Sequence, residues 1–159
     1  MFFIRNAEPS DLATIVRFNA AMAMETEGIE LDDSRLVPGV QAILSDPGKG
    51  RYFMVETDGG VVAQTLITRE WSDWRNGFWW WIQSVYVLPE WRRKGIFRAL
   101  YEHIEAEAQK SGDAVGLRLY VDNDNIAAQK TYTMLGMEES RYIFFERTGL
   151  AGEGDDKHV

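Results

Sequence analysis

The sequence contains no cysteine and only two histidines, His103 and His158, among its 159 residues. The absence of cysteine excludes disulfides, thiolate metal ligands and a cysteine nucleophile. Two histidines cannot by themselves complete the ligand set that zinc prefers in proteins. We therefore expect no metal site in this chain.

Long apolar runs are also missing, since none reaches the ~18 residues of a membrane span. The segment from Met1 to Arg5 lacks the basic region and the long apolar stretch of a signal peptide. These absences favour a cytoplasmic protein without a membrane partner. The length of 159 residues, with 45% hydrophobic and 26% charged residues, is typical of one globular domain.

Positive charge is scarce overall but locally concentrated. Lys and Arg total 17 against 25 Asp and Glu, which gives a net charge of −8 and argues against a nucleic-acid partner. Four of the basic residues nevertheless lie close together, namely Arg92, Arg93, Lys94 and Arg98. An acidic protein thus carries one dense cationic segment.

Hydrophobic periodicity and turn residues predict the element order β-α-α-β-β-β-α-β-α-β. The expected strands cover residues 2–7, 51–57, 61–71, 78–87, 115–121 and 142–147. The expected helices cover residues 10–24, 34–45 and 95–109, with a last helix that begins after the capping residues 122–125 and reaches residue 135. Hairpins in the middle and strand–helix–strand crossovers at the end predict an α/β fold, a mixed sheet with helices on its faces. We expect a single domain over residues 1–148 and a flexible, glycine-rich acidic tail over residues 149–159.

The cationic segment follows the expected central strand, residues 78–87, and leads into a helix. Gly95 allows a ligand to approach the backbone closely, and the amides at the start of a helix favour an anion. A diphosphate would suit this turn. The alternative is a solvated basic turn that only offsets the acidity of the chain.

Two motifs make the pattern more specific. Arg-Arg-Lys-Gly-Ile-Phe at residues 92–97 follows a strand that ends Val-Tyr-Val-Leu-Pro at residues 85–89. About 30 residues later come Asn125, Ala128, Tyr132, Gly136 and Met137. These segments resemble the acyl-CoA loop, Arg/Gln-x-x-Gly-x-Gly/Ala, and the Asn-x-x-Ala-x-x-x-Tyr-x-x-x-Gly-Phe motif of the GNAT superfamily of N-acetyltransferases. The resemblance in element order extends from Phe2 to Arg147.

The resemblance implies that acetyl-CoA, or another acyl-CoA, is the co-substrate and that it binds between the central strand and the next strand. Backbone groups of Val85 and Val87 would pair with the pantetheine arm, and Asn125 would lie near it. The pyrophosphate would be held by the loop and the helix start, whose residues are Arg92, Arg93, Lys94, Gly95, Ile96, Phe97 and Arg98. Phe97 stands where the family usually has Gly or Ala, so its ring must turn away from the phosphates.

Tyr132 would lie beside the thioester sulfur and protonate the leaving thiolate as a general acid. The amide of Val85 could stabilise the carbonyl oxygen as negative charge develops there. Because the chain has no cysteine, direct attack by the amine is favoured over an acyl-enzyme. The alternative for Tyr132 is a core aromatic, since it shares a helical face with Ala128 and Leu135.

The sequence gives weaker signals for the acceptor site than for the acyl-CoA site. Some family members carry a glutamate base on the central strand, but residues 78–87 contain no acid. Glu25 and Glu27, at the end of the first expected helix, could bind a cationic amine and deprotonate it directly or through water. The alternative is a solvated acidic loop.

All six tryptophans lie between Trp71 and Trp91. Trp71 and Trp74 could line the acceptor site, pack in the core, or lie in a homodimer interface. On two-residue alternation, Trp79 and Trp81 lie on one face of their strand and Trp80 on the other.

These observations favour an acyl-CoA-dependent N-acetyltransferase that acts on a primary amine of a small cationic molecule. One alternative is an acetyltransferase that acts on a protein or peptide amine. Another is a GNAT-fold module that binds acyl-CoA without catalysis, and the least specific is a generic anion-binding domain.

Overall fold

The computed structural model describes residues 1–150, and contacts between residues divide the chain into two compact units. The first unit is Met1–Tyr120 and the second begins at Val121. The expected flexible tail, residues 149–159, falls almost entirely outside the described residues. Each unit is described below by itself.

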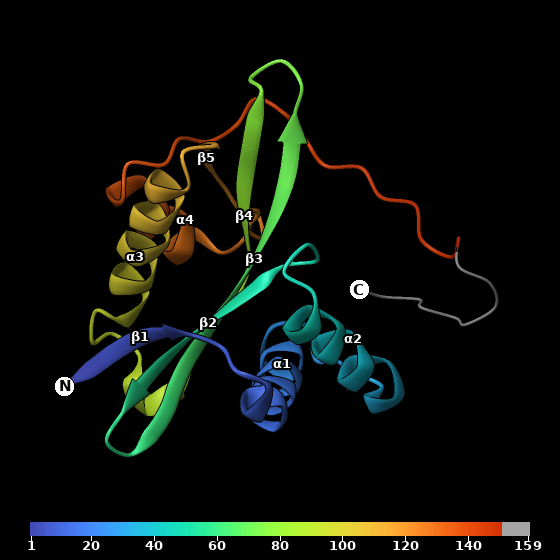
Figure 1. Ribbon diagram of the computed structural model, residues 1–159, viewed down its shortest axis with the longest axis vertical. Coiled ribbons are helices and arrows are strands. Elements are labelled where there is room, and N and C mark those ends of the chain that lie inside the picture. The colour runs from blue at the N-terminus through green and yellow to red at the C-terminus, as the bar shows by residue number, and fades with distance from the viewer. Residues whose placement is uncertain (151–159) are drawn as a thin grey trace. The chain divides into compact units, whose positions relative to one another are not determined.

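The first unit contains a five-stranded mixed sheet with three helices (Figure 1). Its strands are β1 (Phe2–Asn6), β2 (Arg51–Thr57), β3 (Gly60–Ser72), β4 (Gly77–Val87) and β5 (Ala114–Arg118). Its helices are α1 (Leu12–Glu27), α2 (Asp33–Ser45) and α3 (Ile96–Ser111). The strand order is β1-β2-β3-β4-β5, antiparallel except for the parallel pair β4–β5. The predicted α/β class is confirmed.

The helices cover both faces of the sheet, with α1 and α2 on one face and α3 on the other (Figure 1). Alternation along β2 shows the division, because Met54 belongs to a core cluster with Ile15 of α1 and Val40 of α2, whereas Phe53 meets His103 of α3. The predicted apolar face of α3 is buried, at Ile96, Leu100, Ile104 and Ala108. Burial of these two apolar layers is the main stabilisation of the unit.

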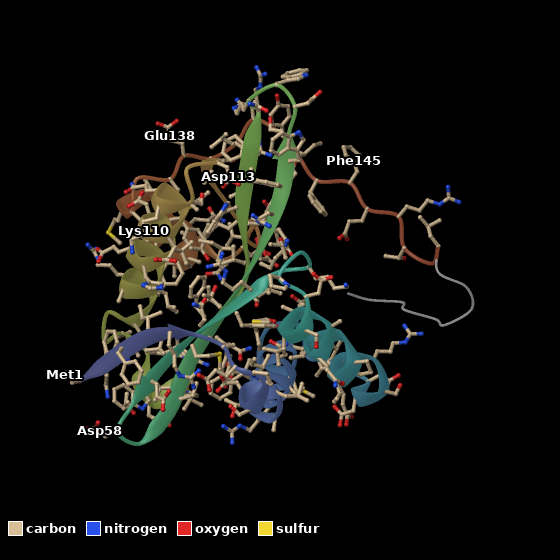
Figure 2. All side chains as sticks on the ribbon, in the orientation of Figure 1. Met1, Asp58, Lys110, Asp113, Glu138 and Phe145 are labelled. Atoms are coloured by element: carbon tan, nitrogen blue, oxygen red, sulfur yellow. The ribbon has the colours of Figure 1, made fainter. Side chains whose placement is uncertain are left out.

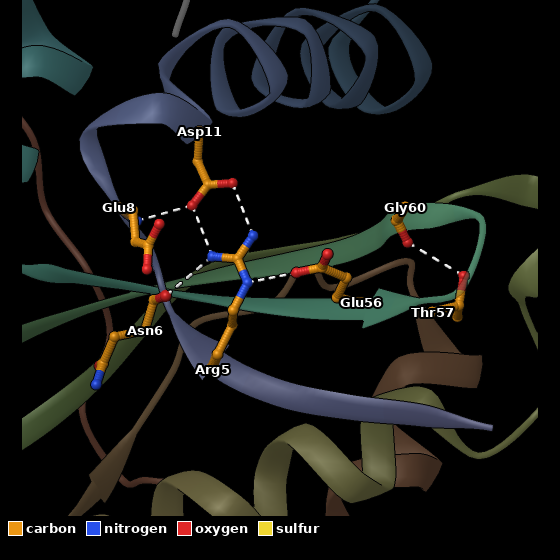
Figure 3. Close-up of polar contacts among 7 residues, drawn as sticks. All are labelled: Arg5, Asn6, Glu8, Asp11, Glu56, Thr57 and Gly60. Carbon is orange, nitrogen blue, oxygen red and sulfur yellow. Dashed lines mark hydrogen bonds and ion pairs between the residues drawn. The ribbon is translucent and has the colours of Figure 1, made fainter.

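The β1–α1 connection is fixed by a polar cluster around Arg5 (Figure 3). The Arg5 guanidinium donates to both carboxylate oxygens of Asp11, at 2.7 and 2.9 Å, and to Glu56 on β2. The Asp11 carboxylate also accepts from the Glu8 amide. Asp11 is 6% exposed, and its hydrogen bond with Arg5 lowers the pKa of its carboxyl group. This cluster ties the start of α1 to the sheet edge, and so helps to set where the far end of α1 lies.

Strand β4 changes character halfway along its length. It pairs with β5 only from Phe78 to Trp81. Beyond this point an extra residue, Gln83, enters β4 between the pairs Ile82–Ile67 and Ser84–Leu66. Such a bulge bends a strand and changes its twist. Among the described residues of the first unit, β4 from Ile82 to Val87 has a strand partner on the β3 side alone.

The second unit contains one helix, α4 (Ile126–Met134), among its described residues. The Asn125 side chain caps it by accepting from the Ala128 amide at 3.1 Å, and Gly136, at φ 86°, follows its end. These two ends agree with the sequence.

The predicted strand at residues 142–147 is wrong, because these residues form no strand. Its aromatic and β-branched residues favour extended structure, but a strand needs a partner to satisfy its backbone. No such pairing occurs among the described residues, and Phe145 is 86% exposed (Figure 2).

Candidate active site

The half of β4 that diverges from β5 presents backbone groups away from β3. The Leu88 amide donates to the Val62 carbonyl at 2.9 Å, so Leu88 faces β3. Because backbone direction alternates along a strand, the N–H and C=O groups of Val87 and Val85 point to the opposite side. These are the two residues that the sequence predicted to pair with an extended ligand.

The cationic loop follows this strand end directly. A 3₁₀ turn, Pro89–Trp91, leads to Arg92, and the side chains of Arg92, Arg93, Lys94 and Arg98 are all exposed. Two loop residues have left-handed backbone, Arg93 at φ 61° and Gly95 at φ 80°. For Arg93 this conformation is uncommon and carries strain, and strained residues of this kind cluster at functional sites.

Gly95 is also the N-cap of α3, and no side chain caps this helix. The amides of a first helical turn have no acceptor within the helix, and the helix dipole is positive there. Ile96 is buried, so its side chain anchors the helix start in the core. Phe97 is partly buried in the same turn. The loop therefore combines four cationic side chains with a helix start that has no built-in cap.

Glu25 lies in the last turn of α1 and reaches the end of β4. Its carboxylate accepts from Tyr86 Oη at 3.1 Å and pairs with Arg92 Nη2 at 2.5 Å. Arg92 in turn donates from Nε to the Val87 carbonyl at 2.9 Å. The structure thus brings together three residues that the sequence assigned to a site, Glu25, Arg92 and Val87.

The charge balance of this cluster determines its chemistry. Arg92, with a smaller contribution from Tyr86, lowers the pKa of Glu25. Burial, followed by the nearby Glu25 carboxylate, raises the pKa of the Tyr86 phenol, which therefore keeps its proton. While Arg92 is in place, the Glu25 carboxylate therefore stays ionised and is a weaker base than an ordinary glutamate. Glu27 is exposed, and no hydrogen bond or ion pair of its side chain is seen within residues 1–150.

Tyr86 was missed by the sequence analysis because it stands in an apolar strand. The alternation of side chains along a strand could have indicated it, because Tyr86 lies on the opposite face of the sheet from Val85 and Val87. Its ring packs against Phe18 of α1 at 5.1 Å between centroids. Beside it on β3, the buried Gln64 donates to Asn19 of α1 at 2.7 Å, and Asn19 donates to Tyr52 at 3.1 Å. These polar contacts hold α1 against the sheet beneath Glu25.

Farther along the same face, Trp79 and Trp81 flank an arginine. The Arg118 guanidinium lies 3.9 Å from the ring centroid of Trp79 and pairs with Glu70 at 3.2 Å. Trp81 Nε1 also donates to Glu70 at 2.7 Å. Trp80, on the opposite face, is 2% exposed, so the predicted alternation of the three tryptophans is confirmed.

Trp71 and Trp74 lie at the far end of the β3–β4 hairpin and are exposed. Trp71 meets Phe78 edge to face at 4.9 Å. Phe78 is roughly 25 Å along β4 from Tyr86, at about 3.3 Å per strand residue. The structure therefore does not bring these tryptophans together with Glu25, and their contact with an acceptor stays a prediction.

Asn125 and Tyr132 belong to the second unit, so their placement near the loop stays a prediction. Asn125 caps α4, as described above. Burial raises the pKa of the Tyr132 phenol above the ordinary tyrosine value, and the phenol is protonated at neutral pH. This is the protonation state that a general acid needs.

Two kinds of feature are absent from residues 1–150. No helix there is long and apolar enough to cross a membrane. No group of three or more His, Cys, Asp or Glu side chains there has the arrangement of a metal site.

Comparison with known proteins agrees with this geometry. A sequence profile described as the acetyltransferase (GNAT) family matches residues 17–137. A crystal structure of a possible acetyltransferase from Clostridium difficile 630 is 48% identical, with a TM-score of 0.88 over 94% of this chain and 99% of that one. No curated protein matches the sequence. The chain therefore belongs to the GNAT family of acetyltransferases, as its two motifs predict.

More distant structures share the fold. The aminoglycoside N-acetyltransferase AAC(6')-Iy in complex with CoA is 16% identical, with a TM-score of 0.76 over 93% of this chain and 95% of that one. A ribosomal-protein-alanine N-acetyltransferase from Brucella melitensis biovar Abortus 2308 is 16% identical, with a TM-score of 0.74 over 93% of this chain and all of the other. At this identity the likeness concerns the fold alone.

Proposed function

We propose that this acetyltransferase uses an acyl-CoA, most naturally acetyl-CoA, and transfers the acyl group directly to a primary amine of a small cationic molecule. One observation carries the proposal. In a chain of this family, the half of β4 that pairs with β3 alone among the described residues of the first unit is followed by a cationic loop and an uncapped helix start.

The residues present fit coenzyme A. Val85 and Val87 offer outward backbone groups to an extended amide-bearing arm, in the way that a strand is added to a sheet. The loop and helix start offer positive charge and backbone amides to a diphosphate. A Cβ added at Gly95 would meet nothing within 4 Å, so the backbone there is open to close approach. The diphosphate would be held by Arg92, Arg93, Lys94, Gly95 and Arg98, together with the amides of Ile96 and Phe97.

The bound acyl-CoA supplies an activated thioester carbonyl, and the protein must orient the amine against it, stabilise negative charge and provide a proton. Because the protein holds both reactants in one site, the entropic cost of bringing them together is met by binding, and the reaction step is faster. The Val85 amide is our candidate donor to the carbonyl oxygen. Tyr132, whose phenol is protonated at neutral pH, is our candidate acid for the leaving sulfur.

The acceptor is proposed to enter on the α1 side of β4, where Glu25 attracts its charge. Glu25 is an ionised carboxylate at this entrance, with a pKa below the ordinary glutamate value, and we assign it to cation binding. Removal of the amine proton then falls to Glu27 or to ordered water. The fold likeness to the aminoglycoside enzyme is consistent with a small polycationic acceptor and does not identify one.

The test combines binding with turnover. We expect acetyl-CoA to raise the melting temperature of the protein, and free CoA to be released with at least one amine from a panel of polyamines, amino acids, aminoglycosides and peptides. If free CoA is released with peptides alone, the acceptor is a protein or peptide amine and not a small cationic molecule. Stabilisation without release on any amine would favour a binding module, and no stabilisation would refute acyl-CoA use.

A further inference from the structure

The guanidinium of Arg92 touches both candidate substrate sites at once. Its Nε atom donates to the Val87 carbonyl, which faces the side where the CoA arm is expected. Its Nη2 atom pairs with the Glu25 carboxylate, which is expected to bind the acceptor amine. Arg92 therefore occupies two groups that the substrates are expected to use: the Val87 carbonyl for the CoA arm and the Glu25 carboxylate for the acceptor amine.

The Arg92–Glu25 ion pair is exposed and therefore easy to break. The side chains of Arg92 and Glu25 are 44% and 41% exposed, so water can replace each partner. Exposed ion pairs are weak, because solvent screens them and two long side chains must be ordered. A diphosphate carries more negative charge than one carboxylate, and arginine binds phosphate oxygens in a bidentate way. An anionic ligand at the adjacent loop is thus a stronger partner for Arg92 than Glu25 is.

The Glu25 carboxylate also accepts a hydrogen bond from Tyr86, and this bond does not depend on Arg92. Tyr86 Oη donates to Glu25 Oε1 from a ring that is held between β4 and Phe18 of α1. When Arg92 leaves, Tyr86 keeps the carboxylate in place and one of its oxygens becomes available. The Glu25–Tyr86 pair is then a preformed anionic site without its internal cation.

We propose that Arg92 couples the two substrate sites: it neutralises Glu25 in the free protein, and CoA binding draws it away and exposes Glu25 to the acceptor cation. This inference rests on the proposed function, that is, on acyl-CoA binding at the loop after β4. An ammonium group that arrives before CoA must displace the guanidinium from Glu25, so it binds more weakly than one that arrives after CoA. Arg92 is in this sense a positioning residue, and its effect on the acceptor passes through Glu25.

Because Glu25 and CoA compete for Arg92, the coupling can be tested by CoA binding alone, without an acceptor and without turnover. Glu25→Gln removes the internal partner of Arg92, so CoA should bind about fivefold more tightly to this variant than to the wild type, the upper end for an exposed ion pair. The matched control is Glu27→Gln, which removes the same charge two positions away. Its effect on the CoA dissociation constant should stay below about twofold, the level of a general electrostatic change. Isothermal titration with CoA measures both, and thermal melts of each variant check its folding.

A double-mutant cycle separates competition from long-range attraction. In an Arg92→Gln background, Glu25→Gln should no longer tighten CoA binding, because the group that it releases is absent. Tyr86→Phe, which leaves the Arg92–Glu25 pair intact, should change CoA affinity little. Equal tightening with and without Arg92, equal effects of the Glu25 and Glu27 variants, or weaker CoA binding to Glu25→Gln would each overturn the coupling. If the wild type binds no CoA, the proposed function fails and the coupling with it; if CoA binds and the cycle shows no coupling, the coupling alone fails.

Discussion

Arg92 Nη2 lies 2.5 Å from Glu25 Oε2, although 67 positions separate the two residues in the sequence. The contact joins the loop after β4 to the last turn of α1. It places the first cation of the expected cofactor loop against the first carboxylate of the expected acceptor site. The chemistry of Glu25 is therefore set by a residue from the other half of the site.

The pKa of Glu25 should depend on Arg92. The guanidinium lowers this pKa, so Glu25 in the wild type stays ionised to a lower pH than an ordinary glutamate. In Arg92→Gln we expect the pKa of Glu25 to rise toward that of an ordinary glutamate, because the largest cause of its lowering is removed. NMR titration of the side-chain carboxyl carbon of Glu25 measures the shift. An unchanged Glu25 titration in Arg92→Gln would contradict the ion pair.

Tyr132→Phe should remove the proposed general acid while keeping the ring. We expect kcat to fall by about 100-fold, the scale of general acid catalysis, with little change in CoA affinity. Tyr142→Phe is a suitable control, because it changes an exposed tyrosine of the same unit. Steady-state release of CoA and titration with CoA give the two quantities. Full activity of Tyr132→Phe would rule out the assignment.

The cationic loop should recognise the diphosphate and not the pantetheine arm. Arg93→Gln and Arg98→Gln should each weaken CoA binding by about fivefold and reduce its dependence on salt. Binding of pantetheine, which lacks the diphosphate, should stay unchanged. Lys49→Gln, in the turn after α2, removes the same charge from another part of the surface. Equal loss in the Lys49 and Arg93 variants would indicate a general charge effect and argue against a built site.

The close approach of β4 and β5 should depend on Gly77. A Cβ at this position would lie 2.6 Å from the Asp113 carbonyl oxygen, a backbone atom that cannot turn aside. Gly77→Ala should therefore lower the free energy of unfolding by about 2 kcal/mol, as overpacking does. Gly39→Ala should instead raise it by up to about 1 kcal/mol, because Gly39 lies in α2 with nothing within 4 Å of an added Cβ. Urea unfolding of both variants tests the contrast, and equal stability of the two would contradict it.

Much of the fold could be predicted, because periodicity and turn residues are local signals. The strand at residues 51–57 agrees with β2 residue for residue. The apolar positions of residues 95–109 are the buried face of α3. The strand expected at residues 142–147 failed, because residue preferences there describe extended backbone and say nothing about a partner.

The site could be predicted only in part, for a related reason. The motif at residues 92–97 indicated the loop, since its residues are contiguous. The Glu25–Arg92 pair depends on α1 packing across β4, and no short motif encodes that contact. The divergence of β4 from β5 depends on the extra residue Gln83, which looks like any other strand residue in the sequence.

The most direct test of acetyl transfer follows the acetyl group itself. The protein is incubated with acetyl-CoA labelled with ¹³C in the acetyl group and with the amine that releases most CoA, and both acceptor and protein are analysed by mass spectrometry. We predict one labelled acetyl group on the acceptor nitrogen and no labelled acetyl on the protein at any time before completion. Label that first accumulates on a protein side chain, or an acceptor that remains unlabelled while CoA is released, would contradict direct transfer to the amine.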